Sequence, residues 1–234
     1  MDRREFNGVW RPMLAAWMGL THAAGHAFSL ADISQSDATQ ALKMALNQGA
    51  QVAVTQLGRS NGFLGNEKVR IELPGHLHDA ANMLRRFGQG HQIDELVTAM
   101  NRAAEEAVPM ALDMLVLAVR SMSVNDAKKI LNGGDTAATG FFAEKTRAPL
   151  GQKFLPVVTR TTSKVGLAEK YNQVAGRASE LGLMKKEDAA IEHHVTGKAL
   201  DGLYYMIGVE ERKIRQDPVG TGSALIGKVF GAVK

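Results

Sequence analysis

The chain has 234 residues, with 28 Lys and Arg against 24 Asp and Glu, 45% hydrophobic residues and no cysteine. This composition is typical of a soluble globular protein. The lack of cysteine excludes a disulfide scaffold, a cysteine zinc site, a thiolate nucleophile and an iron–sulfur cluster. The small net charge, without a basic stripe beside stacking aromatic side chains, does not favour nucleic-acid binding.

The first 27 residues have the pattern of an export signal. Three arginines in residues 1–11 precede a short apolar stretch at 13–20, and Ala27 supplies a small residue for the peptidase. This order predicts cleavage after Ala27 and a periplasmic mature protein, and an ordinary amphipathic first helix is the less favoured alternative. The apolar stretch is too short to span a bilayer. The pair Arg3-Arg4 partly fits the twin-arginine pattern, so the twin-arginine and general secretory routes both stay open.

Helical spacing of apolar residues dominates the rest of the chain and predicts an all-α fold, a single-domain multi-helix bundle over residues 28–234. Ser36 or Asp37 is expected to cap the first helix, and Ser123 with Asp126 predicts a capping box. The helices are expected at 36–58, 75–87, 91–122, 123–132, 135–142, 150–162, 167–181, 187–216 and 223–234.

Two of these segments carry further expectations. Residues 108–122 are nearly all apolar, which predicts the central buried helix, and Pro109 is expected to kink or restart it. The connection from Gly58 to Gly75 is long and rich in glycine, and residues 68–73 alternate polar and apolar. It predicts one extended segment without a partner strand, which is either functional or pinned to the body of the domain.

The candidate catalytic and metal-binding residues are isolated. Ser60 lies in a G-x-S-x-G pattern, but a helix is expected before it and a loop after it, whereas a nucleophile elbow follows a buried strand. The adjacent pair His193-His194 has poor spacing for a shared metal ion. Asp113, inside an apolar helix, either pairs with a cation at the rim or serves as a functional acid. The sequence therefore assigns no catalytic residue, no metal site and no cofactor.

Two other segments have alternative readings. Residues 132–135, Asn-Gly-Gly-Asp, either present backbone N–H groups to an anion or join a helix C-cap to an N-cap. The apolar stripe of residues 225–233 either lies on a membrane surface or docks on the core of the domain, and docking is the favoured reading.

Several separated stretches, in order along the chain, resemble a known family. They are 62–66 leading into 68–71, 100–105 with 108–109, 130–131 with 133–135, 164–167 with 171–172, and 198–203. The family is the bacterial one catalogued as domain of unknown function 4197. The resemblance covers nearly the whole mature chain and implies a helical exported bacterial protein, and it carries over no activity, partner or site residue.

These observations favour a binding or protein-interaction module. The expected contact surface combines the long connection, through Lys68 and Arg70, with Asn101, Arg102 and Glu105. The plainer alternative is that Arg102 pairs with Glu106 and the connection packs on the bundle.

Two further alternatives stay open. One is a hydrolytic or metal-dependent enzyme that uses Asp113 or the His193/His194 region. The other is a peripheral membrane protein held by its C-terminal helix.

Overall fold

A computed structural model describes residues 34–180 and 190–232, and within these ranges the protein is an all-α bundle without strands, as predicted. The expected export signal at 1–27 and the expected helix start at 187 lie outside the described residues. The α-helices are α1 (Gln35–Gly58), α2 (His78–Arg86), α3 (Gly90–Ala107), α4 (Leu112–Arg120), α5 (Val124–Leu131), α6 (Ala137–Thr162), α7 (Gly166–Glu180), α8 (Ile191–Gln216) and α9 (Ala224–Ala232).

The N-cap of the first helix lies two residues before Ser36, the earlier of the two caps predicted from the sequence. Ser34 is its N-cap, and the Ser34 hydroxyl accepts a hydrogen bond of 3.0 Å from the Asp37 N–H. The buried face of α1 consists mainly of alanine and leucine at helical spacing, from Ala41 to Leu57. Such small side chains let neighbouring helices approach closely, and α1 accordingly packs on both α4 and α8.

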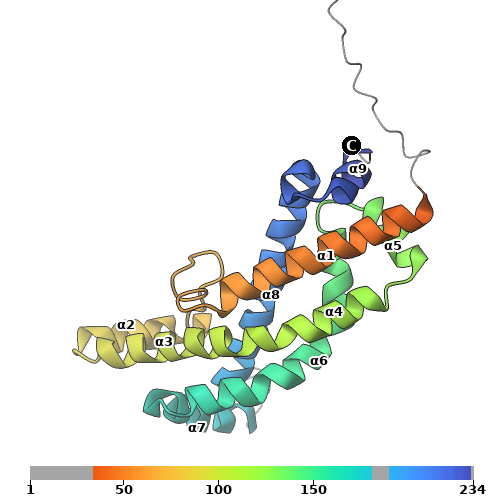
Figure 1. The fold of residues 1–234 in the computed structure, drawn as a ribbon. Coiled ribbons are helices and arrows are strands. Elements are labelled where there is room, and N and C mark those ends of the chain that lie inside the picture. Colours follow the sequence, from red (N-terminus) through yellow and green to blue (C-terminus); the bar gives the residue numbers. More distant parts are fainter. Residues whose placement is uncertain (1–33, 181–189, 233–234) are drawn as a thin grey trace, which may run out of the picture.

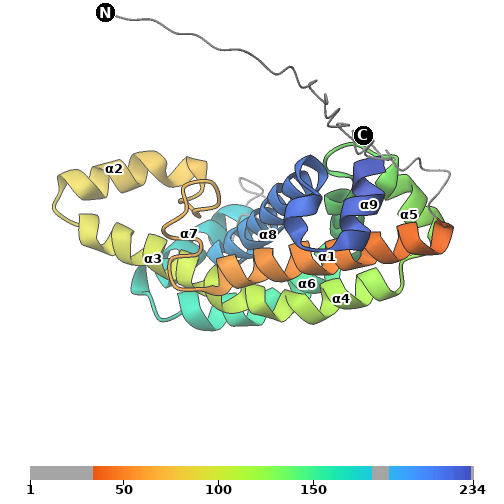
Figure 2. The same cartoon turned by 45° about the horizontal axis from the view of Figure 1, so that its top comes forward.

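The centre of the bundle is α8. Helices α1, α3–α4 and α6 run side by side, and α8 crosses behind them in Figure 1. One face of α8 is buried along almost its whole length, from Ile191 to Ile214. The distal half of the α2–α3 hairpin projects from this body, at the left of Figure 2.

The prediction that residues 108–122 form the central buried helix is wrong. The chain turns through a 3-10 segment at Val108–Ala111, with Pro109 in its first turn, and restarts as α4. Pro109 therefore restarts the helix, which was one of the two effects expected of it, and does not merely kink it. Only Leu115, Ala118 and Val119 of α4 are buried, while Leu117 is 60% exposed. Most of the other apolar side chains of α4 are half-buried, and the exposed side carries Asp113 and Arg120 beside Leu117.

Helix α6 is longer than expected and is capped by another helix. It runs without a break from Ala137 to Thr162, where two separate helices were predicted. Its N-cap residue makes no side-chain hydrogen bond. Instead, the buried carboxylate of Glu211 on α8 accepts hydrogen bonds from the backbone N–H groups of Ala138 (3.0 Å) and Thr139 (2.9 Å). Residues 132–135 connect the C-cap of α5, Asn132, to the N-cap of α6, Thr136, as the second of their two readings had it, and the carboxylate at the helix start comes from the protein itself.

The C-terminal helix docks on the core. Ile226, Val229 and Phe230 of α9 are buried, and α9 packs against α1 and α8. The described part of the stripe proposed for membrane contact is therefore covered by the protein's own helices, which agrees with docking on the core and not with the membrane alternative. Among the described helices, none is by itself long and apolar enough to cross a bilayer. Only 90–120 taken together with 124–131 passes that test, across a bend of 104°.

Candidate functional site

The long connection between α1 and α2 is a folded segment, and we refer to residues 59–74 as the connecting segment. Its first part is a series of tight turns closed by backbone hydrogen bonds, from Gly62 N–H to Arg59 C=O through Arg70 N–H to Asn66 C=O. Phe63 and Ile71 are buried at 0% and 1% exposure, while Lys68 and Arg70 are exposed. The segment thus has its own apolar anchors and presents its charged side chains outward.

Asn101 of α3 takes the place of a partner strand for this segment. Its Oδ1 accepts a hydrogen bond from the Ile71 N–H at 2.8 Å, and its Nδ2 donates to the Ile71 carbonyl at 2.8 Å. The same Nδ2 donates to the Val97 carbonyl at 2.8 Å. Because Asn101 is fully buried, one side-chain amide satisfies both backbone groups of Ile71 where water cannot.

Glu105, one turn further along α3, holds the start of the connecting segment. Its Oε1 accepts hydrogen bonds from the N–H groups of Phe63 (3.0 Å) and Leu64 (3.1 Å), and its side chain is only 6% exposed. Its Oε2 forms an ion pair of 2.5 Å with Arg102. Backbone N–H groups and a guanidinium together neutralise a carboxylate that would be costly to bury alone.

Arg102 completes this anchor. Besides Glu105, its guanidinium donates to Ser60 Oγ at 3.1 Å and to Asn61 Oδ1 at 2.8 Å. The expected pairing of Arg102 with Glu106 is therefore wrong. Glu106 instead bonds Thr161 and Arg160 of α6, and these two hydrogen bonds hold the pKa of Glu106 below its usual value. The rest of the plainer alternative is right, because the segment packs on the bundle.

Two glycines make this close packing possible. A Cβ on Gly62 would lie 2.3 Å from the Leu57 carbonyl oxygen, and Asn61 just before it has a φ of 62°. A Cβ on Gly202 of α8 would lie 2.6 Å from Cε1 of Phe63. The connecting segment therefore lies directly on the backbone of α8 at this position.

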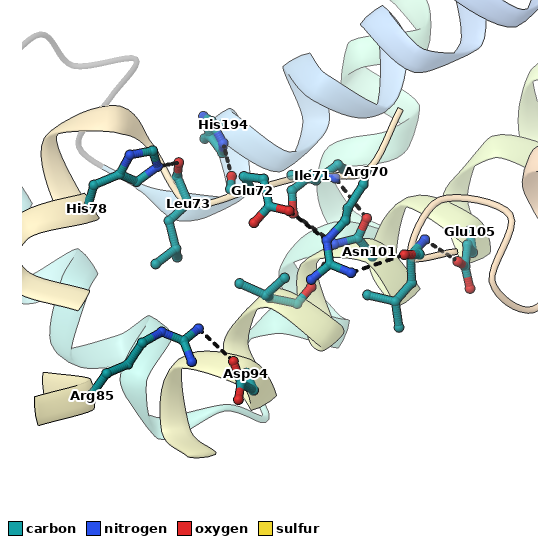
Figure 3. A network of polar contacts seen from close by, with 12 residues as sticks. Arg70, Ile71, Glu72, Leu73, His78, Arg85, Asp94, Asn101, Glu105 and His194 are labelled. Atoms are coloured by element: carbon teal, nitrogen blue, oxygen red, sulfur yellow. Dashed lines mark hydrogen bonds and ion pairs between the residues drawn. The ribbon is translucent and has the colours of Figure 1, made fainter. Parts of the chain in front are cut away.

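The second half of the connecting segment is held from three sides, as Figure 3 shows. The Arg70 guanidinium bonds Glu72 Oε1 at 2.6 Å and the Leu64 carbonyl at 3.3 Å. His194 Nε2 on α8 lies 3.0 Å from the Glu72 carbonyl oxygen, and His78 Nε2 on α2 lies 3.2 Å from that of Leu73. These contacts fix an irregular backbone between α2, α3 and α8.

A groove opens between the outer side of this segment and α8, and we call it the segment groove. Its volume is about 520 Å³. It is lined by Lys68, Val69, Arg70, Glu72, Leu73, Gly75, His194, Lys198, Asp201, Gly202 and Tyr205. The segment groove is open to solvent and combines charged side chains with one aromatic ring, which suits the recognition of a polar ligand or partner.

The structure divides the five predicted contact residues into two groups. Lys68 and Arg70 line the segment groove. Asn101, Arg102 and Glu105 lie beneath the connecting segment and bond to it, so their hydrogen-bonding capacity is used inside the protein. These three side chains therefore position the connecting segment that forms one wall of the groove.

Apart from His194, which was considered only as a metal ligand or part of an enzyme site, the sequence analysis missed the α8 side of the groove. Lys198, Asp201 and Tyr205 lie at i, i+3 and i+7 on α8, which places them on one exposed face. The spacing of these three residues can be read from the sequence, but most polar helix faces are simply solvated. The pattern indicates a groove wall only together with the position of the connecting segment beside α8.

The other candidate residues are separated from each other. Ser60 follows helix α1 without a strand before it, and its hydroxyl accepts a hydrogen bond from Arg102, so the nucleophile-elbow geometry is not present. Asp113 is exposed on α4, and no described cation pairs with it. It is therefore not a buried acid, and the rim ion pair expected for it is not formed with any described residue.

His193 and His194 face different grooves. His194 bonds the connecting segment, while His193 borders a second groove beside Glu192. The Glu192 carboxylate is buried and accepts hydrogen bonds from Asn172 and Thr162. Within the described ranges, no group of three or more His, Asp or Glu side chains is placed to share a metal ion.

Comparison with known proteins identifies the family alone. No curated protein and no solved structure is significantly similar to the chain. A family described as protein of unknown function (DUF4197) matches residues 32–231, a range that includes both walls of the segment groove. The chain therefore belongs to the family DUF4197.

Proposed function

We propose that this protein is an exported binding module that recognises a partner through the segment groove. The observation that carries the proposal is the contrast between the two sides of the connecting segment. Its inner side is fixed by buried Asn101 and Glu105, while its outer side presents Lys68 and Arg70 to an open groove. Fixing an irregular backbone in this way reduces the entropy lost on binding.

The length of this segment and the number of buried contacts that hold it support the proposal. A helix-to-helix connection needs only a few residues. Here the connection has sixteen folded residues, and two buried polar side chains form hydrogen bonds to them. Conformationally fixed loops on a rigid scaffold are typical places for binding residues.

Export is part of the proposal and is supported by two sequence observations. Residues 1–27 have the basic, apolar and small-residue order of a signal peptide. The family match begins at residue 32, just after the proposed cleavage point at Ala27. The mature protein would then meet its partner in the periplasm.

Site-specific photo-crosslinking in the native cells tests the binding proposal. Benzoylphenylalanine in place of Tyr205 keeps an aromatic ring in the groove, where Tyr205 is 41% exposed. The control carries the same amino acid in place of Leu117 on α4, which is outside the groove and more exposed at 60%. We expect a discrete adduct from position 205 and none from 117. No adduct from position 205, or the same adducts from both, would overturn the proposal.

A further inference from the structure

We infer that the partner bound by the segment groove is an acidic peptide segment in an extended conformation, a step that rests on the function proposed above. The first observation is the unequal pairing of charges along the groove. Glu72 is paired with Arg70, and Asp201 with Arg147 at 2.5 Å. Both acids of the groove are thereby occupied by arginines.

The two lysines of the groove are left with little or no pairing. Lys68 has no ion-pair partner among the described residues. Lys198 lies 3.6 Å from Asp201, a carboxylate already held by Arg147. The ammonium groups, one on each wall of the groove, are exposed and available to carboxylates.

The second observation concerns the backbone edge of residues 70–73. Both backbone groups of Ile71 are hydrogen-bonded to the side chain of Asn101. The carbonyl of the next residue, Glu72, is bonded by His194 of α8, and Glu72 lines the groove. No described residue accepts a hydrogen bond from the Glu72 N–H. The N–H of this groove residue is therefore a donor available to a peptide carbonyl or carboxylate.

These features favour a peptide over a small anion. A small anion is bound by donors that converge on one point in a concave site, whereas the ammonium groups here are on opposite walls of an open groove. Tyr205 adds an exposed ring for an apolar or aromatic side chain of the ligand. A peptide with carboxylates on either side of an apolar or aromatic side chain matches the arrangement of the two lysines and Tyr205.

Titration of the mature protein with synthetic peptides tests the inference. The probe is an acetylated Glu-Asp-Phe-Asp-Glu peptide, and its partner probe has Gln and Asn in place of the acids. We expect the acidic peptide to bind and the amide peptide to bind at least about tenfold more weakly, with affinity falling as salt is raised. Citrate and inorganic phosphate serve as small-anion probes and are expected not to compete.

Charge-reversal variants locate the binding. Lys68→Glu combined with Lys198→Glu changes exposed side chains only and should weaken the acidic peptide by roughly a hundredfold. The control Lys153→Glu changes an exposed lysine of α6 outside the groove and should bind as the wild type does. Equal binding of both peptides, unchanged binding by the double variant, or displacement by phosphate would overturn the inference.

These outcomes separate the inference from the proposal on which it rests. If benzoylphenylalanine at position 205 still yields a discrete adduct while the peptides and variants fail, the groove binds a partner that is not an acidic peptide. If neither experiment shows binding, both statements are wrong.

Discussion

Replacing Asn101 by alanine should detach the connecting segment from the bundle. The change removes three hydrogen bonds of 2.8 Å and leaves the N–H and carbonyl of Ile71 without partners, at a position where both residues are buried. Each unsatisfied buried group costs roughly 1–3 kcal/mol, and the higher helix propensity of alanine offsets about 0.5 kcal/mol. We therefore expect a loss of about 3 kcal/mol in the free energy of unfolding.

Urea unfolding followed by circular dichroism measures this loss, and amide hydrogen exchange shows where it occurs. The exchange of Ile71 and its neighbours in the connecting segment should accelerate most. Asn101→Asp keeps the size and the acceptor for the Ile71 N–H but cannot donate to the carbonyls of Ile71 and Val97. It should destabilise the protein at least as much as alanine.

The matched control is Asn82→Ala, on the exposed surface of α2. It makes the same chemical change without a buried partner, so the free energy of unfolding should stay within about 0.5 kcal/mol of the wild type. The reasoning is refuted if Asn101→Ala behaves like this control, or if the exchange of the Ile71 amide does not change.

Three further predictions concern other parts of the fold. Glu211→Ala removes the carboxylate that caps α6 and should lower the free energy of unfolding by about 3 kcal/mol in urea unfolding; a change below 0.5 kcal/mol would refute the capping role. Gly202→Ala forces a Cβ against the buried ring of Phe63, so we expect a loss of about 1–3 kcal/mol by the same assay, and an unchanged midpoint would contradict the packing. Hydrogen bonds from Ser123 hold the pKa of Asp126 below its ordinary value. The stabilisation is therefore present above the unfolded pKa of about 4 and lost as pH falls through the native pKa. The stability difference between wild type and Asp126→Asn should shrink towards acid pH in denaturant titrations, and a constant difference would exclude this linkage.

The local signals in the sequence identified most of the helices, because helical spacing and capping residues act over one or two turns. The capping box of Ser123 and Asp126 and the restart at Pro109 are present in the structure as predicted. The start of α6 differs because its cap is Glu211, which lies more than seventy positions away in the sequence. No local pattern reports such a contact.

The candidate site could be predicted only in part for the same reason. The length and glycine content of the connection indicated a pinned or functional segment, and Lys68 and Arg70 do line the groove. The residue types of Asn101 and Glu105 are compatible with either a surface or a buried position. Their burial follows from hydrogen bonds to the backbone of the connecting segment, which the residue types do not indicate. The α8 wall depends on the contact of Gly202 with the ring of Phe63, two residues far apart in the sequence, so no local pattern predicts it.

For the apolar residues 108–122 the sequence predicted more burial than the structure has. Composition alone predicted a buried helix, but only one side of α4 faces the core and Leu117 is exposed. Burial of a helix depends on how many neighbours surround it, and in this bundle α8 has helices on several sides.

The most direct test of the account is the intact mass of the chain recovered from the periplasm of cells that carry benzoylphenylalanine at position 205, after irradiation. The account predicts a chain that begins at Phe28 and carries one discrete partner mass. A chain that retains residues 1–27, or one that carries no partner mass, would contradict it.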